Sequence, residues 1–227
     1  MFLDLLPSAE RLILESGVLT QEDKYFWGAM DTIRVIPNPV RFRPEKPAPL
    51  DRKTVIAVGR YTHQKGLERL IEAWNLIPKK SGWILHLVGD GEERPSLESR
   101  IRALGLEGSV QLGKAETDMA KVYSGASILA LSSRYEGLPM ALLECQAFGV
   151  PAVSFDCKCG PREIIVPGET GFLVPEGDIA GLANALQKLI QDDSLRNEMG
   201  LSAFRNASAW QPETIMQKWI QLFEEIS

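Results

Sequence analysis

The chain has 227 residues, of which 44% are hydrophobic and 24% are charged. This length accommodates one large domain with an appendage, and this composition is typical of a folded globular protein, which excludes a largely disordered chain. The net charge is -5, from 25 basic and 30 acidic residues, so we expect no nucleic-acid partner and only a local site for any anion.

Residues 1–39 contain two candidate strands with a short helix between them. The apolar runs 11–19 and 32–36 predict the strands, and Thr20 followed by Asp23 predicts the start of the helix. These elements are too few to fold alone. No basic lead precedes the first apolar residues and no apolar run reaches about 18 residues, so we expect a cytoplasmic protein, with peripheral attachment at the inner face of the membrane left open.

The three cysteines, Cys145, Cys157 and Cys159, indicate reduced thiols rather than a disulfide framework. A metal site would need more ligands than Cys-x-Cys provides, and the two histidines, His63 and His86, are far from these cysteines and from each other in the sequence. We therefore expect no metal.

Residues 40–53 predict a linker, because they carry three prolines and five basic residues without periodicity. From 54 to 209, short β-branched runs alternate with amphipathic stretches, as in βαβ units. This pattern predicts an α/β domain, a doubly wound parallel sheet of the Rossmann-like type. The expected strands are 54–58, 83–88, 109–112, 127–131, 151–155 and, more weakly, 171–174.

Residues 210–227 predict one amphipathic helix that begins near Pro212 and Glu213. Its apolar stripe must cover another surface and consists of Ile215, Trp219, Leu222, Phe223 and Ile226. We expect this helix and the first residues of the chain to leave apolar surface that favours self-association or a partner domain.

Glycines and polar residues follow the expected strands, at the edge where open parallel sheets bind their ligands. They are 59–66 after the first strand, 89–91 after the second, Gly113 after the third and 133–136 after the fourth. We expect all of them to face one crevice.

Two common phosphate motifs are almost present. The stretch 89–91 lacks the third glycine of the dinucleotide fingerprint, because Arg94 stands in its place. The stretch 108–114 lacks the magnesium-binding hydroxyl of the P-loop, because Ala115 follows it. These departures argue against a nicotinamide enzyme and against a nucleoside triphosphatase.

Glu136 and Glu144 flank the expected start of a helix. Carboxylate pairs of glycosidases lie about 5 to 9.5 Å apart, whereas eight residues of helix rise about 12 Å. This spacing weighs against a hydrolytic pair, although Glu136 could fold back, and it favours one extended ligand bound at two points. In a sugar nucleotide, Glu144 would accept hydrogen bonds from the ribose and Glu136 from the sugar.

The helix start at 137–141 would direct free amides and the positive end of the helix dipole toward a diphosphate between the two carboxylates. Across the crevice, Arg60 and Lys65 would supply the two positive charges that hold this diphosphate as a leaving group.

From about residue 54 to 192, the chain resembles the C-terminal half of the family 4 retaining glycosyltransferases of the GT-B fold. Within that family it is most similar to the capsular and exopolysaccharide transferases of the amylovoran type. The motifs that carry the resemblance are Gly59-Arg60 with Lys65-Gly66, 88–91, 132–140, Glu144, 154–157, 160–165 and 168–171.

The resemblance implies a hexosyltransferase of polysaccharide biosynthesis that moves a sugar from a nucleotide-diphosphate donor, usually a UDP-sugar, to a glycan or lipid-linked acceptor with retention. The implied catalytic residues are Arg60 and Lys65, at the diphosphate, and Glu136, at the donor sugar. The implied donor-binding residues are Gly59, Gly89, Leu112, Gly113, Lys114, Met119, Gly137, Leu138, Met140, Ala141 and Glu144. Family members need no metal for donor binding.

Family members also have a first Rossmann-like domain, which binds the acceptor and supplies a histidine near the reacting carbon. Residues 1–39 resemble the tail of that domain and the crossover, and neither His63 nor His86 matches the histidine. A second hypothesis is therefore an inactive nucleotide-sugar-binding module without its acceptor domain. An epimerase or phosphorylase on the same fold is a weaker alternative, because no residues resemble a pyridoxal lysine site.

Overall fold

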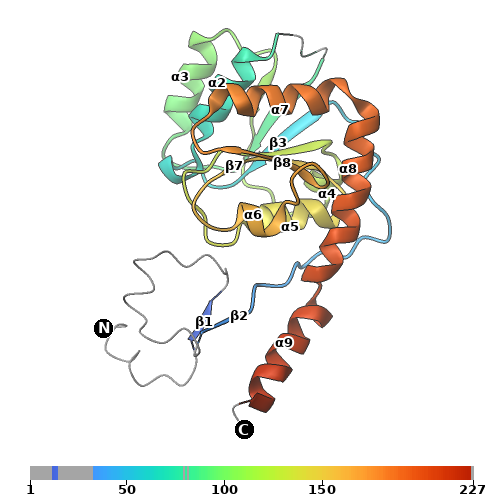
Figure 1. Cartoon of the computed structure of the whole chain (residues 1–227). Coiled ribbons are helices and arrows are strands. Elements are labelled where there is room, and N and C mark those ends of the chain that lie inside the picture. Colours follow the sequence, from blue (N-terminus) through green and yellow to red (C-terminus); the bar gives the residue numbers. More distant parts are fainter. Residues whose placement is uncertain (1–11, 15–32, 79, 81, 226–227) are drawn as a thin grey trace, which may run out of the picture.

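The structure, a computed structural model, describes residues 12–14, 33–78, 80 and 82–225. Its main body is a six-stranded parallel sheet in the order β5-β4-β3-β6-β7-β8, with helices on both faces (Figure 1). The strands are β3 (Thr54–Val58), β4 (Ile84–Val88), β5 (Val110–Leu112), β6 (Ile128–Leu131), β7 (Ala152–Asp156) and β8 (Gly171–Pro175). The predicted doubly wound α/β fold is confirmed, and each strand begins within one residue of its predicted start.

Strand β3 pairs with both β4 and β6, so the strand order reverses between β3 and β6 at the centre of the sheet. In an open parallel sheet, the loops that follow the two strands at such a switch point diverge and leave a crevice. The candidate stretches 59–66 and 133–136 follow these two strands.

Two apolar clusters bind the helices to opposite faces of the sheet. Successive strand residues alternate between them, as the pleat requires: Val55 and Ala57 belong to one cluster and Ile56 to the other. Helices α2 (Leu67–Leu76), α3 (Arg94–Ala103) and α7 (Ile179–Gln191) cover the first face, and α4 (Met119–Ser124), α5 (Met140–Ala147) and α6 (Pro161–Ile164) cover the second. The remaining elements of this body are η3 (His63–Lys65), α8 (Asp193–Asn206) and η4 (Ala207–Trp210).

The predicted linker 40–53 has no helix or strand, and it packs against the domain. Val40 is fully buried, and its amide donates to the Trp210 carbonyl oxygen over 2.8 Å. The ring of Phe42 contacts the rings of Tyr123 and Phe148 edge-on, with centroids 5.9 and 5.3 Å away. This packing holds the segment against α4 and the C-terminal end of α5.

The last helix, α9 (Pro212–Glu225), begins where the sequence predicted and extends away from the sheet (Figure 1). Ile215 and Leu222 form a small cluster with Ile36, which follows β2 (Ile33–Val35). Met216, Ile220 and Phe223 are exposed on α9, so Phe223 does not share the burial predicted for the apolar stripe, and the predicted Ile226 lies outside the described residues. Within the described ranges, no helix combines the length and apolarity needed to cross a membrane.

At the N-terminal end, β2 pairs in parallel with β1 (Leu12–Leu14). These two strands lie inside the predicted runs 11–19 and 32–36. The predicted helix start at Thr20 and Asp23 lies outside the described residues. The division of the chain into domains at residues 39, 53 and 209 stays a prediction.

Candidate functional site

Two neighbouring cavities lie at the switch point of the sheet. The first has a volume of about 290 Å³ and the second of about 330 Å³. Both are lined by Val58, Gly59 and Met119, which come from the end of β3, the loop after it and the start of α4. The shared residues make the two cavities parts of one crevice.

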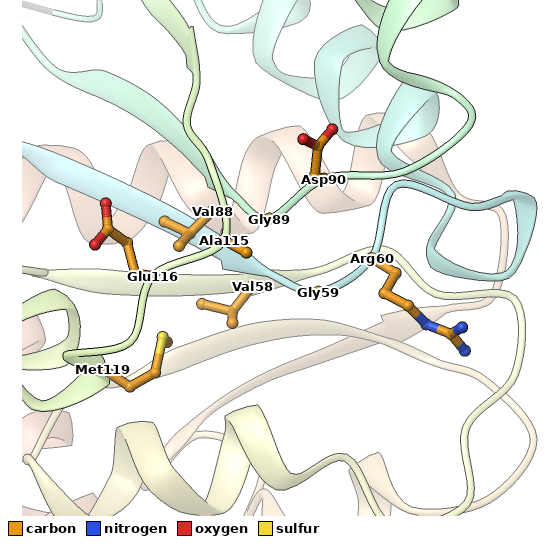
Figure 2. Close-up of a pocket in the computed structure, with 9 residues that line it drawn as sticks. All are labelled: Val58, Gly59, Arg60, Val88, Gly89, Asp90, Ala115, Glu116 and Met119. Carbon is orange, nitrogen blue, oxygen red and sulfur yellow. The ribbon is translucent and has the colours of Figure 1, made fainter.

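The first cavity lies at the carboxyl ends of β3 and β4, and its inner walls are apolar (Figure 2). Arg60 lies at one side of this view, and Glu116 and Met119 lie at the other, Met119 at the start of α4. The cavity brings together four predicted site residues, Gly59, Arg60, Gly89 and Met119. Its other lining residues are Val58, Val88, Asp90, Ala115 and Glu116.

Lys65 and Glu136 form an ion pair in the second cavity. The Lys65 Nζ donates to Glu136 Oε1 over 2.7 Å, and the two side chains are 22% and 6% exposed. The Ser133 hydroxyl donates to the same oxygen over 2.6 Å. Two residues that were predicted to be catalytic thus neutralise each other at the carboxyl ends of β3 and β6, and Ser133 fixes the orientation of the carboxylate.

Glu144 lies on α5 at another point of the second cavity, and its carboxylate is buried. Glu144 Oε2 accepts a hydrogen bond from the Tyr123 hydroxyl over 2.6 Å, and Oε1 lies 2.9 Å from the Arg41 Nε. Burial raises the pKa of Tyr123 well above its usual value, so its hydroxyl stays protonated and acts as the donor. Arg41 and Tyr123 also line the cavity.

Helix α5 begins at Met140, inside the predicted range 137–141 but three residues after Gly137. The physical reason is Pro139, whose ring disfavours helical backbone at the preceding residue, Leu138. Met140, Ala141 and Leu138 line the second cavity, whereas the exposed Gly137 lines neither cavity. The first helical turn, whose amides lack partners within the helix, therefore still borders the crevice.

The predicted residues Leu112, Gly113 and Lys114 line neither cavity. Gly113 is packed against His86, since a Cβ at this position would lie 2.7 Å from the His86 Nε2. Lys114 is exposed. The residues after them, Ala115 and Glu116, are the ones from this loop that reach the first cavity.

Ser133 belongs to the stretch 133–136 that was expected to face the crevice, whereas Arg41, Tyr123 and Glu116 were not predicted from the sequence. The position of Glu116 shortly after a strand is a signal that could have identified it. Arg41 gave no such signal, because it stands in a segment without periodicity. Within the described ranges, no cluster of three or more His, Cys, Asp or Glu side chains could hold a metal ion.

Tyr61 ties together the strand ends behind the first cavity. Its hydroxyl donates to the Leu87 carbonyl oxygen over 2.7 Å, with the Gly113 carbonyl oxygen at 3.3 Å. The side chain is fully buried, and this burial raises the pKa of Tyr61 to about 12, because the phenolate would lose its hydration.

The substitution Tyr61→Phe is expected to lower the free energy of unfolding by about 1 kcal/mol at pH 8, because it removes a buried hydrogen bond. In the wild type, the contribution of Tyr61 to the free energy of unfolding is complete below pH 10.0, the pKa of Tyr61 in the unfolded chain. It is lost as the pH rises toward about 12, the pKa of Tyr61 in the folded protein. By pH 11 about 1.4 kcal/mol is lost, so the difference of about 1 kcal/mol between the two proteins should disappear or slightly reverse its sign. Urea unfolding of the two proteins at pH 8 and pH 11 measures their free energies of unfolding. An equal difference at the two pH values would contradict the raised pKa of Tyr61.

Comparisons with known proteins find related sequences and structures. Residues 40–205 match the family described as glycosyl transferases group 1. Amylovoran biosynthesis glycosyltransferase AmsD of Erwinia amylovora is 38% identical over 165 residues, which cover 73% of this chain and 46% of AmsD. Lipopolysaccharide 1,6-galactosyltransferase of Escherichia coli is 36% identical over 175 residues, which cover 71% of this chain and 47% of the relative.

Among solved structures, a variant of TarM of S. aureus in complex with fondaparinux, alpha-GlcNAc-glycerol and UDP has a TM-score of 0.83 at 25% identity. The match covers 97% of this chain and 45% of that chain. The present chain therefore spans about half the length of each of these three relatives.

Proposed function

Because the chain belongs to the group 1 glycosyl transferases, we propose that it binds an NDP-sugar, specifically a UDP-sugar, and transfers the sugar with retention to a glycan or lipid-linked acceptor. AmsD and the lipopolysaccharide galactosyltransferase are named for polysaccharide and lipopolysaccharide synthesis, which supports this acceptor class. The UDP in the TarM complex supports the choice of nucleotide.

The observation that carries the proposal is the second cavity. One space of about 330 Å³ is lined by Lys65, Glu136, Glu144 and the first residues of α5. These groups match a nucleotide-sugar from end to end. One carboxylate can accept hydrogen bonds from the ribose and the other from the sugar, while the cation and the free helix amides can hold the diphosphate. The apolar first cavity beside it is suited to the base.

In the proposed reaction, the bond between the anomeric carbon and the β-phosphate oxygen breaks, the acceptor oxygen bonds to that carbon from the same face, and the acceptor hydroxyl proton passes to the departing phosphate oxygen. The departing UDP gains negative charge. Lys65, which its ion pair with Glu136 holds in place, and the amides at the start of α5 would stabilise this charge without reorganisation. The exposed Arg60, at the neighbouring first cavity, would add a second positive charge. Glu136 would hold the sugar hydroxyls through acceptor positions that Lys65 and Ser133 leave unused.

Glu144 offers the direct test. Glu144→Gln should weaken UDP binding about 10-fold to 150-fold, equivalent to about 1.5–3 kcal/mol, because a neutral amide replaces the charged acceptor for the ribose hydroxyls. Isothermal titration of UDP into wild type and variant measures the effect. Glu224→Gln, on the exposed side of α9, is the control and should not change the affinity.

Equal UDP affinities of wild type and Glu144→Gln would contradict the proposed contact between Glu144 and the ribose. Assays of sugar transfer and donor hydrolysis by the same protein separate the two hypotheses. Turnover supports the transferase, whereas tight UDP binding without turnover favours a nucleotide-sugar-binding module.

A further inference from the structure

Two residues from outside α5 hold the carboxylate of Glu144, one on each oxygen. Tyr123, on α4, donates its hydroxyl proton to Oε2 over 2.6 Å. The Arg41 Nε, from the segment before β3, lies 2.9 Å from Oε1. The Glu144 side chain is 10% exposed, and all three residues line the second cavity.

A carboxylate has about four lone-pair positions, two on each oxygen. Arg41 and Tyr123 occupy one position on each oxygen of Glu144, so one acceptor position on each oxygen is left for a ligand. Two vicinal hydroxyls, such as those of a ribose, supply two donors at a matching separation.

We propose that Arg41 and Tyr123 are positioning residues, which fix the Glu144 carboxylate so that its two remaining acceptor positions receive the 2′- and 3′-hydroxyls of the donor nucleotide. This inference rests on the proposed function, since it assumes a nucleoside diphosphate in the second cavity. On this proposal, Arg41, Tyr123 and Glu144 together, rather than Glu144 alone, make the site select nucleotides that carry both ribose hydroxyls.

The packing around the network supports a positioning role. Tyr123 is 1% exposed, and its ring lies against Phe42 and Phe148, with centroids 5.9 and 5.8 Å away. The Arg41 guanidinium lies 4.5 Å from the centroid of the Phe42 ring, on its face. Phe42 therefore orients both donors, and the buried Val40 anchors the segment that carries Arg41 and Phe42.

The test compares UDP with 2′,3′-dideoxy-UDP, which lacks both hydroxyls, by isothermal titration. The wild type should bind UDP at least about 10-fold more tightly than the dideoxy nucleotide. In Tyr123→Phe and in Arg41→Ala, the UDP affinity should fall about 10-fold while the affinity for the dideoxy nucleotide stays within about twofold, so the preference should nearly disappear.

Arg43→Ala is the matched control. Arg43 lies two residues after Arg41 and pairs with Glu213 over 2.7 Å, and it lines neither cavity. It should keep the wild-type preference. Tyr123→Phe retains the aromatic packing, so it tests the hydroxyl even if the arginine substitution disturbs the segment.

The outcomes separate this inference from the proposed function. If the wild type prefers UDP and both variants keep that preference, the positioning roles are wrong and the proposed function stands. If both variants lose affinity for the two nucleotides equally, their roles are merely structural and the inference fails. A wild type that binds neither nucleotide overturns the proposed function and this inference with it.

Discussion

Lys65→Ala is expected to weaken UDP binding about 100-fold, because it removes a cation from the proposed diphosphate site and leaves the carboxylate of Glu136 without its cationic partner. In the wild type these groups are 2.7 Å apart, and the Glu136 side chain is only 6% exposed. An unpaired negative charge in such a shielded position would repel the diphosphate. Isothermal titration of UDP measures the loss.

The double variant Lys65→Ala/Glu136→Gln identifies the cause. If repulsion by Glu136 contributes, removal of its charge should restore about 10-fold of the lost affinity, so the two substitutions should be strongly non-additive. Equal affinities of the single and the double variant would show that the loss of the cation alone explains the effect.

Arg69→Ala is a control of similar burial. Arg69 is 21% exposed and pairs with Glu176 over 2.5 Å, but it lines neither cavity. Its loss should leave UDP affinity within about twofold of the wild type. Wild-type UDP affinity in Lys65→Ala would contradict the proposed diphosphate site.

The fold was predictable from the sequence because its strands are short apolar runs between amphipathic stretches. The burial pattern of β6, where all four residues are buried, shows why a continuous apolar run rather than strict alternation marks a central parallel strand. The family resemblance, which the comparisons confirm, rests on loops that follow these strands. Strand ends are set by local sequence, so the position of these loops could be found without a structure.

The start of α5 lies inside the predicted range 137–141, and local sequence explains why it is not at Gly137. The restriction that Pro139 places on Leu138 keeps residues 137 and 138 out of the helix, which begins at Met140. The first turn of the helix still borders the second cavity, because its start lies only three residues after Gly137.

The network around Glu144 could not be predicted in the same way. Glu144 and Arg41 are far apart in the sequence, and their contact depends on the path of the segment before β3 across α4 and α5. That path is fixed by Phe42 against Tyr123 and Phe148, which are tertiary contacts without a periodic pattern. Glu144 could be identified from the sequence, whereas Arg41 and Tyr123, which contact its carboxylate, could be identified only from the structure.

The close approach of two loops at the first cavity makes Gly89 the glycine with the largest expected effect on stability. Gly89 follows β4 with a φ of 151°, and a Cβ added there would lie 1.9 Å from the carbonyl oxygen of Gly59, in the loop after β3. The backbone at Gly59 is itself tied to β4, since its amide donates to the Val88 carbonyl oxygen over 3.1 Å. An added methyl group can therefore be accommodated only if the strand ends separate.

Gly89→Ala is accordingly expected to lower the free energy of unfolding by about 3 kcal/mol, because it forces apart backbone atoms that have no flexible side chain to yield. Urea unfolding monitored by tryptophan fluorescence measures the change. Gly108→Ala is the control, since no atom lies within 4 Å of a Cβ at that position. Superimposable curves for wild type and Gly89→Ala would mean that the loops after β3 and β4 do not touch, and the first cavity could not have the shape described.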